Sequence, residues 1–444
     1  MILIFPFCSL HFIPLRLSVF RGLFSPYNLH ASINILYHNI MESRHRFSAL
    51  YVRDFRFFLF GQAISLSGTW MQSLAQSWLV YSLTKSPLYL GIIASLSSLP
   101  ILVFTLLGGM VADKYPKRKI LIITQTLSVI PALALGILTG LKVITIWQVG
   151  VAAALLGTVN AFDIPARQSF LAEVVSKGDI TNAIALNSAA FNGARIIGPV
   201  IAGFTIANLG IPACFYLNAV SFIAVIFALR NIETKGVIRA HQGGLIKGIT
   251  SGWDFVLKER QVLYIMSLIA VFSLFGIPYI TLLPILAGEI LNVGARGLSF
   301  LVASAGAGSL IAAMTLAFKG EVKRKDIYIP LSGLVFSLAI LGLSFSRRFP
   351  ISLICIFFAG WGVVSFLATS NSLIQHRVPD PLRGRVMSLY TLVFLGLAPL
   401  GNSVIGFTAE ALGTTVSLKI FALICILGSI IFYKMYGKEA KVNS

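Results

Sequence analysis

A cluster of charges follows a long apolar run in GGMVADKYPKRK, residues 108–119. Asp113 lies four residues after Gly109 and four before Lys117, and Arg118 comes next. A glycine lets a second helix approach closely, and an acid at this spacing can cap a helix N-terminus or pair with an arginine. The cations can also simply hold the segment at the inner membrane surface, as in any basic inner loop. We treat Gly109, Asp113, Lys117 and Arg118 as a candidate conformational switch.

Two further charges interrupt apolar stretches. Arg195 lies about twelve residues into one of them, where a cation costs several kcal/mol unless it meets a partner or water. Its partner can be an anionic group of a substrate or an acid such as Asp163. Asp163 can instead be a helix-end charge beside Arg167, or a proton carrier, because burial favours the neutral acid. The other candidate proton carriers are Asp113, Glu289 and Glu410.

Uncharged polar residues within apolar runs can line a cavity or form hydrogen bonds between helices. These residues are Gln72, Gln76, Asn160, Asn187, Asn192, Thr369 and Asn371. With Arg195 and Asp163, we take Gln72, Asn160 and Asn187 as candidates for substrate or proton coupling. The scattered cysteines and histidines show no metal-ligand spacing, so we expect no metal and no cofactor. The chain also lacks a nucleophile with its base and a Walker-type phosphate loop, which argues against an enzyme or an ATPase.

The composition indicates an integral membrane protein that must position these residues. Of 444 residues, 57% are hydrophobic and 11% are charged. Apolar runs of about 20 residues are long enough to span a bilayer as helices, and only helices satisfy their backbone groups there within one segment. We predict an all-α membrane protein with twelve spans, at about 57–83, 87–112, 119–140, 144–166, 183–207, 212–230, 261–287, 297–318, 327–345, 350–375, 385–410 and 414–434.

The distribution of basic residues predicts the orientation. Most of the 35 Lys and Arg lie before the first span, after the last span, and in every second connection between spans. The alternate connections and nearby helix ends carry few, namely Lys85, Lys142, Arg296, Arg347, Arg348 and Lys419. The positive-inside rule therefore places both termini in the cytoplasm. Because the bases lie in short segments and not on one solvated face, the net charge of +20 does not indicate nucleic-acid binding.

Two similar segments suggest an internal repeat. GPVIAGFTIANLG at 198–210 aligns with GNSVIGFTAEALG at 401–413, and each lies in the fifth span of its half. The halves therefore look like parallel repeats related by a pseudo-two-fold axis, with a site between them. We expect a first half at 41–230, a cytoplasmic linker at 231–260 and a second half at 261–444. Residues 1–40 do not fit this plan, and we expect native translation to begin at Met41.

The segment 109–118 resembles the loop signature of the major facilitator superfamily, Gly-x-x-x-Asp-Arg-x-Gly-Arg-Arg, with Lys114 at the first arginine and Pro116 at the second glycine. The stretches at 55–91, 182–203 and 383–406 look like the branch that includes the enterobactin exporter and macrolide efflux proteins, of transmembrane secretion effector type. The resemblance covers about 50–435. It implies the twelve-helix major facilitator fold in two six-helix halves.

The resemblance also implies roles for particular residues. The family's loop signature steadies the outward-facing state, and Asp113 would then lie near Arg383 and Arg385 at the start of span eleven. Gly198, Pro199 and Gly203 are similar to the exporters' span-five motif, Gly-x-x-x-Gly-Pro-x-x-Gly-Gly, although Ala194 and Ala202 replace two of its glycines. In the family, this motif accompanies drug antiport.

We therefore expect a monomeric, proton-coupled exporter of a small organic molecule, such as a siderophore, drug or macrolide, in the bacterial inner membrane. An importer of the same fold would share every topological feature. A membrane-embedded enzyme would need a catalytic constellation, and the sequence shows none. A sensor or scaffold would carry a sizeable soluble domain, whereas the longest connection here is about thirty residues.

Overall fold

The computed structural model describes residues 47–234, 245–320, 322 and 324–442, and this part of the chain is all-helical with no β-strand. Residues 1–40, the leader predicted above, lie outside the described residues, as do 235–244 of the predicted linker. The long helices of the first part of the chain are α2 (Arg53–Thr84), α3 (Pro87–Lys114), α4 (Lys117–Gly140), α5 (Ile146–Val174), α6 (Ile180–Leu209) and α7 (Ile211–Arg230).

The second part of the chain begins with α8 (Leu245–Lys258), a helix within the predicted linker. The long helices that follow are α9 (Arg260–Val271), α11 (Gly294–Lys319), α12 (Lys325–Phe345), α13 (Phe349–Arg377), α14 (Asp380–Gly396), α15 (Ala398–Leu412) and α16 (Thr414–Val442). The predicted span at 385–410 is therefore divided between α14 and α15, at Leu397 just before Pro399.

Eleven helical segments of the described chain are long and apolar enough to cross a membrane. Many of their large apolar side chains are exposed, including Leu106, Val220 and Phe407, as expected for surfaces that face lipid. The predicted first span lies in α2, which is not among the eleven although it has 32 residues. Gln62, Ser65 and Gln72 are buried in α2. Polar residues of this kind lower its mean hydropathy, so a twelfth span stays a prediction.

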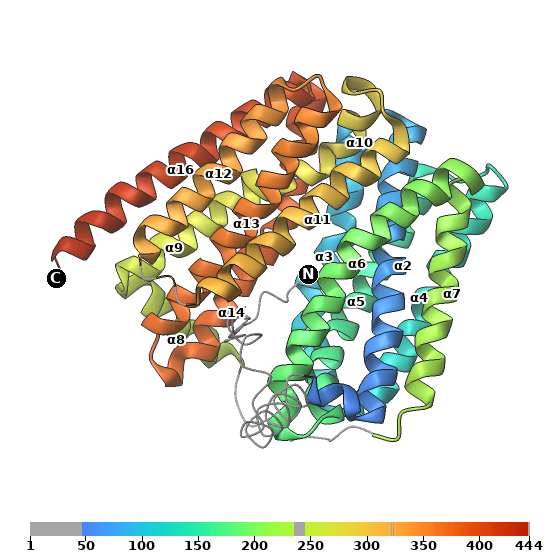
Figure 1. Cartoon of the computed structure of the whole chain (residues 1–444), viewed down its shortest axis with the longest axis horizontal. Coiled ribbons are helices and arrows are strands. Elements are labelled where there is room, and N and C mark those ends of the chain that lie inside the picture. Colours follow the sequence, from blue (N-terminus) through green and yellow to red (C-terminus); the bar gives the residue numbers. More distant parts are fainter. Residues whose placement is uncertain (1–46, 235–244, 321, 323, 443–444) are drawn as a thin grey trace, which may run out of the picture.

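The helices form two groups (Figure 1). Helices α2–α7 pack together on one side, and α9–α16 pack together on the other. The main contacts between the groups join α3 to α15 and α6 to α11. In Figure 1 the two groups converge at the upper edge and lie farther apart at the lower edge, where α8 and α14 are found. A site between the groups is therefore bounded by α3 and α15 and by α6 and α11.

Glycines bring paired helices into backbone contact in both groups. A Cβ on Gly108 or Gly157 would collide with the backbone of the opposite helix in the α3–α5 pair. A Cβ on Gly308 or Gly360 would do the same in the α11–α13 pair. Close approach through small residues provides van der Waals packing where no hydrophobic effect operates between helices in lipid.

One predicted span is not a regular helix. After α9, residues Phe272–Gly276 form the π-helical segment η4, Ile277–Leu282 form the 3₁₀ segment η5, and Leu286–Ile290 form a second π-helical segment, η6. The short α10 (Leu283–Ile285) separates η5 from η6. Pro278 and Pro284 lack the backbone N–H that a regular helix requires, which accounts for the interruption. Irregular backbone at membrane depth is tolerated only where protein or water satisfies it.

Candidate functional site

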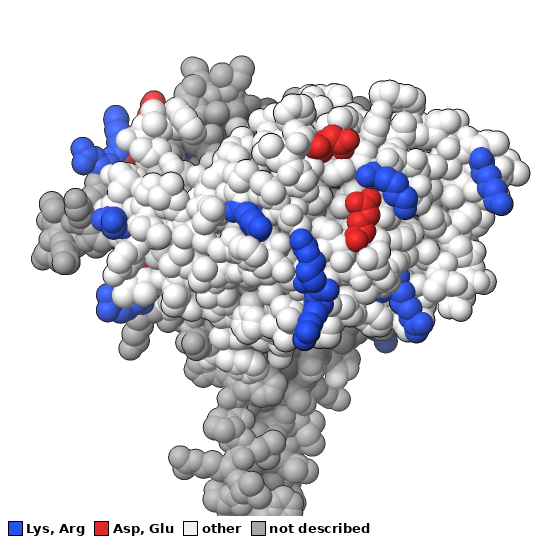
Figure 2. All heavy atoms as spheres, turned by 90° about the horizontal axis from the view of Figure 1, so that it is seen from above, with Lys and Arg blue, Asp and Glu red and all other residues white. Residues whose placement is uncertain are grey.

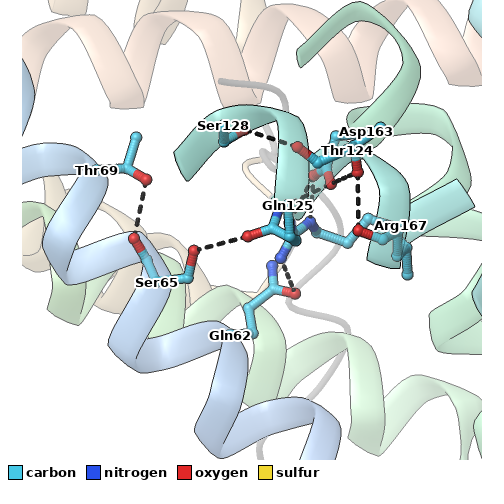
Figure 3. A network of polar contacts seen from close by, with 9 residues as sticks. Gln62, Ser65, Thr69, Thr124, Gln125, Ser128, Asp163 and Arg167 are labelled. Carbon is cyan, nitrogen blue, oxygen red and sulfur yellow. Dashed lines mark hydrogen bonds and ion pairs between the residues drawn. The ribbon is translucent and has the colours of Figure 1, made fainter. Parts of the chain in front are cut away.

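A buried polar network joins α2, α4 and α5 around Asp163 (Figure 3). Its Oδ1 accepts hydrogen bonds from Thr124 Oγ1 at 2.7 Å and Gln125 Nε2 at 2.9 Å. Its Oδ2 accepts one from Arg167 Nε at 2.7 Å, and the Arg167 NH2 group completes an ion pair. Arg167 also donates to Gln62 Oε1 at 2.8 Å.

This geometry ties three helices together with no net charge. Asp163 and Arg167 are separated by one helical turn, so they lie on the same face of α5. Both carboxylate oxygens of Asp163 are occupied by donors of the first helix group. The helix-end pairing with Arg167 is thus the arrangement found, and Arg195 does not take part in it. A role for Asp163 in proton transfer stays a prediction, and it would require several of these hydrogen bonds to break.

Arg195 lies near the midpoint of α6, deep in the protein, but it keeps accessible surface. Among the residues that the structure describes, its side chain has no hydrogen bond and no ion pair. Gly306 of α11, in the other helix group, packs beside the Arg195 backbone, and the buried Tyr279 of η5 is near enough for its phenol to interact with the Arg195 charge. Arg195 is therefore a deep cation at the boundary between the groups.

The candidate polar residues differ in whether another residue of the described chain satisfies their hydrogen-bonding groups. Gln72 accepts a hydrogen bond from Asn218 Nδ2 at 2.7 Å, so it links α2 to α7. Asn160 is partly buried in α5. The buried Oδ1 of Asn187 and Oγ of Ser188, both in α6, have no partner within the described chain. Asn187 and Ser188 therefore have hydrogen-bonding capacity that a bound molecule can use.

At the cytoplasmic side of the predicted topology, two cations of the switch segment are anchored within the first group. Lys117 is buried and pairs with Glu173 of α5 at 3.1 Å, an acid that the sequence analysis did not single out. Arg118 donates to the backbone oxygens of Leu229 and Arg230, each at 2.7 Å. These carbonyls end α7, where a cation interacts favourably with the helix dipole.

The other predicted switch residues lie on α3 and α14. Asp113 is in the last turn of α3. Gly109 lies one turn earlier, where a Cβ would meet no atom of the described residues within 4 Å. Arg383 pairs with Asp380 of its own helix. Arg385 lies against Gly252 of α8. The contact of Asp113 with these arginines stays a prediction.

The span-five motif joins three helices. Gly198 faces the backbone of α2, where a Cβ would meet the Ser67 oxygen at 2.6 Å. Gly203, by contrast, faces Ser299 of α11 in the other group. Pro199 is buried within the same helix. The motif therefore lets α6 pack closely against both its own group and the opposite one.

The opposite end of the molecule carries polar contacts between the groups. Glu410 Oε2 of α15 accepts hydrogen bonds from Ser86 Oγ at 2.6 Å and from the Leu88 N–H at 3.2 Å, at the N-terminus of α3. One to two turns further along, Ser95 Oγ lies 2.8 Å from Ser403 Oγ. Sequence patterns do not reveal these pairings, because their members lie more than 300 residues apart.

The surface at this end is sparsely charged. Figure 2 shows it from above, mostly uncharged, with separated basic side chains and few acids. In the described chain there is also no group of three or more His, Cys, Asp or Glu that could hold a metal ion.

Comparisons with known proteins agree with this architecture. The sequence profile of the transmembrane secretion effector family matches residues 45–443. The staphyloferrin A transporter of Staphylococcus aureus is 28% identical over 85% of this chain and 95% of its own length. The multidrug efflux pump Tap of Mycobacterium tuberculosis is 26% identical over 82% of this chain and 89% of its own length. The nucleoside transporter NupG has a similar fold, with a TM-score of 0.69 at 12% identity over 86% of this chain and 99% of NupG.

The match to the family profile covers most of the chain. The alignments with the two relatives also cover nearly the whole length of each relative. The relatives are transporters and not enzymes, as the sequence analysis predicted. The chain is therefore an integral membrane protein of the transmembrane secretion effector family, within the major facilitator superfamily.

Proposed function

We propose that this protein is a secondary active exporter of a small organic molecule, driven by protons and working by alternating access. The observation that carries the proposal is the distribution of contacts between the helix groups. In the described chain, their polar contacts lie toward the end that bears Ser86 and Glu410. Arg296 of α11 stacks on Phe204 of α6 at 4.8 Å near the same end. A molecule closed at one end suits a transporter that opens alternately to each side.

Two six-helix halves are the moving units in this proposal, and α2 is the twelfth span. The close glycine contacts support the repeat, because Gly157 of α5 and Gly360 of α13 are separated by the same 203 residues as Gly198 and Gly401. The pairs α3–α5 and α11–α13 would then be equivalent under a pseudo-two-fold axis along the membrane normal.

The closed end is the outer one if both termini are cytoplasmic. The basic connections and termini would face the inside of a bacterial inner membrane, as the positive-inside rule requires. The structure would then be an inward-facing conformer of a monomeric transporter. Export rather than import is favoured by the similarity to the efflux pump Tap.

Asp113 is the proposed switch residue. In the outward-facing conformer, the inner end of α3 would approach α14, and Asp113 would meet Arg383 or Arg385. Gly109 supports this because it has open space beside it in the present conformer. An unpacked glycine within a helix costs about 1 kcal/mol relative to alanine, so a contact made only in the other conformer gives a reason for it.

The test is accumulation of fluorescent and siderophore-type compounds in efflux-deficient bacteria that express the full chain. We compare wild type, Asp113→Asn and a matched control, Asp179→Asn, which changes another acid at the same side of the topology. Lower accumulation that requires Asp113 and is abolished by a protonophore supports the proposal. Equal export by Asp113→Asn would remove the switch role, and raised accumulation by wild type would indicate import.

A further inference from the structure

The deep cation Arg195 has no counter-charge among the residues that the structure describes. It lies within a membrane-spanning helix, and the described chain provides no hydrogen bond or ion pair for its guanidinium. A cation at such depth is tolerated when it faces water, a cavity or an anion. Because Arg195 keeps accessible surface, a molecule between the helix groups can reach it.

Three acids of the membrane-spanning helices have partners other than Arg195. Asp163 accepts hydrogen bonds through both oxygens and is paired with Arg167. Glu173 pairs with Lys117 toward one end, and Glu410 binds the N-terminus of α3 at the other end. Glu289, in η6, is exposed. Since no acid of the described chain forms an ion pair with Arg195, a bound molecule can supply its counter-charge.

Two neutral hydroxyl groups lie on the elements that meet near Arg195. Ser188 precedes Arg195 by seven residues, so both lie on one face of α6, and its buried Oγ has no partner in the described chain. Tyr279 comes from the irregular segment η5 of the other group. Gly306 of α11 packs beside Ile196 and the Arg195 backbone, which places the cation where the two groups meet. A ligand held here would contact both groups.

We propose that Arg195 binds a carboxylate of the transported compound, so that the substrates are organic anions. This inference rests on the proposed transport function and specifies its substrate class. A single guanidinium matches the single charge of a carboxylate in a bidentate pair. A phosphate monoester carries about −1.5 to −2 and would leave charge uncompensated. A cationic drug would be repelled.

The test uses one fluorophore with three charges: dansylglycine is an anion, dansylglycinamide is neutral and dansylcadaverine is a cation. Binding to the purified full chain is measured by dansyl fluorescence. Wild type should bind dansylglycine at least about tenfold more tightly than the other two probes. Arg195→Gln should weaken dansylglycine binding by about 10- to 100-fold, the range for hydrogen bonds to a charged group, and leave the neutral probe unchanged.

Two further variants make the result specific. Arg195→Lys keeps the charge without the bidentate fork, so it should show an intermediate affinity and serves if Arg195→Gln does not fold. Arg347→Gln removes an exposed arginine between α12 and α13 and should bind as wild type does. The proposal is overturned if Arg195→Gln keeps the preference for dansylglycine, or if wild type binds the neutral or cationic probe equally well or binds none of the three.

Transport of the same probes in proteoliposomes separates this inference from the proposed function. Selective binding of dansylglycine without export of any probe would contradict the exporter and leave the carboxylate site standing. Export of dansylcadaverine that is independent of Arg195 would support the exporter and contradict the carboxylate site.

Discussion

The adjacent glycines Gly108 and Gly109 of α3 should respond to alanine in opposite ways. A Cβ on Gly108 would overlap the backbone oxygen of Ala161 and lie 3.1 Å from the Phe162 Cα, so α3 and α5 would have to separate. Overpacking of this kind typically costs about 1–3 kcal/mol. A Cβ on Gly109 would meet no atom of the described chain within 4 Å, and alanine there should stabilise the helix by about 0.5–1 kcal/mol.

The assay is thermal unfolding of the purified protein, combined with transport by the same variants. Gly108→Ala should melt below wild type, and Gly109→Ala should melt at or above it. If the outward-facing conformer needs close approach at Gly109, Gly109→Ala should nevertheless transport more slowly. Equal melting of both variants would refute the described α3–α5 contact. Wild-type transport by Gly109→Ala would refute a conformer-specific contact at that glycine.

Arg167→Gln should destabilise the protein by about 3 kcal/mol, because it leaves the buried Asp163 carboxylate without its cation, and thermal unfolding measures this. Lys117→Met should be similarly harmful through its buried partner Glu173, and adding Glu173→Leu should restore much of the lost stability, as a double-mutant cycle would show. Glu410→Gln should weaken the closed end by about 1 kcal/mol and shift the conformers roughly fivefold toward outward opening, detectable as a changed spin-label distance distribution across that end.

Hydropathy predicts the spans well because a bilayer imposes a length and a composition on each helix. It is least informative where polar residues face the interior, as in α2, whose buried Gln62 and Gln72 resemble solvent-exposed residues in a sequence. It also cannot show how a span is built internally. The predicted span at 261–287 reads as one apolar run, but Pro278 and Pro284 divide it into π and 3₁₀ segments.

The charged site residues were recognisable by type, but their partners were not. Asp163 had two possible partners in the sequence, and the nearby Arg167 is the one found because one helical turn separates them. Glu173 was not singled out, and Glu410 was named only as a candidate proton carrier, because their contacts depend on which helices pack together. That Arg195 has no partner within the described chain becomes visible only from the positions of its neighbours in the structure.

If the two helix groups move as proposed, the contact between Gly91 and Gly406 would be their pivot. At these residues the backbones of α3 and α15 touch, because a Cβ on Gly91 would lie 2.9 Å from the Gly406 Cα. From Gly91 to its end at Lys114, α3 is about 35 Å long at 1.5 Å per residue. A lever of this length moves its far tip by about 0.6 Å for each degree of rotation. A change no larger than the tolerance of one hydrogen bond at the end that bears Ser86 would thus become an ångström-scale displacement at the Lys114 end of α3, so the pivot would amplify small adjustments.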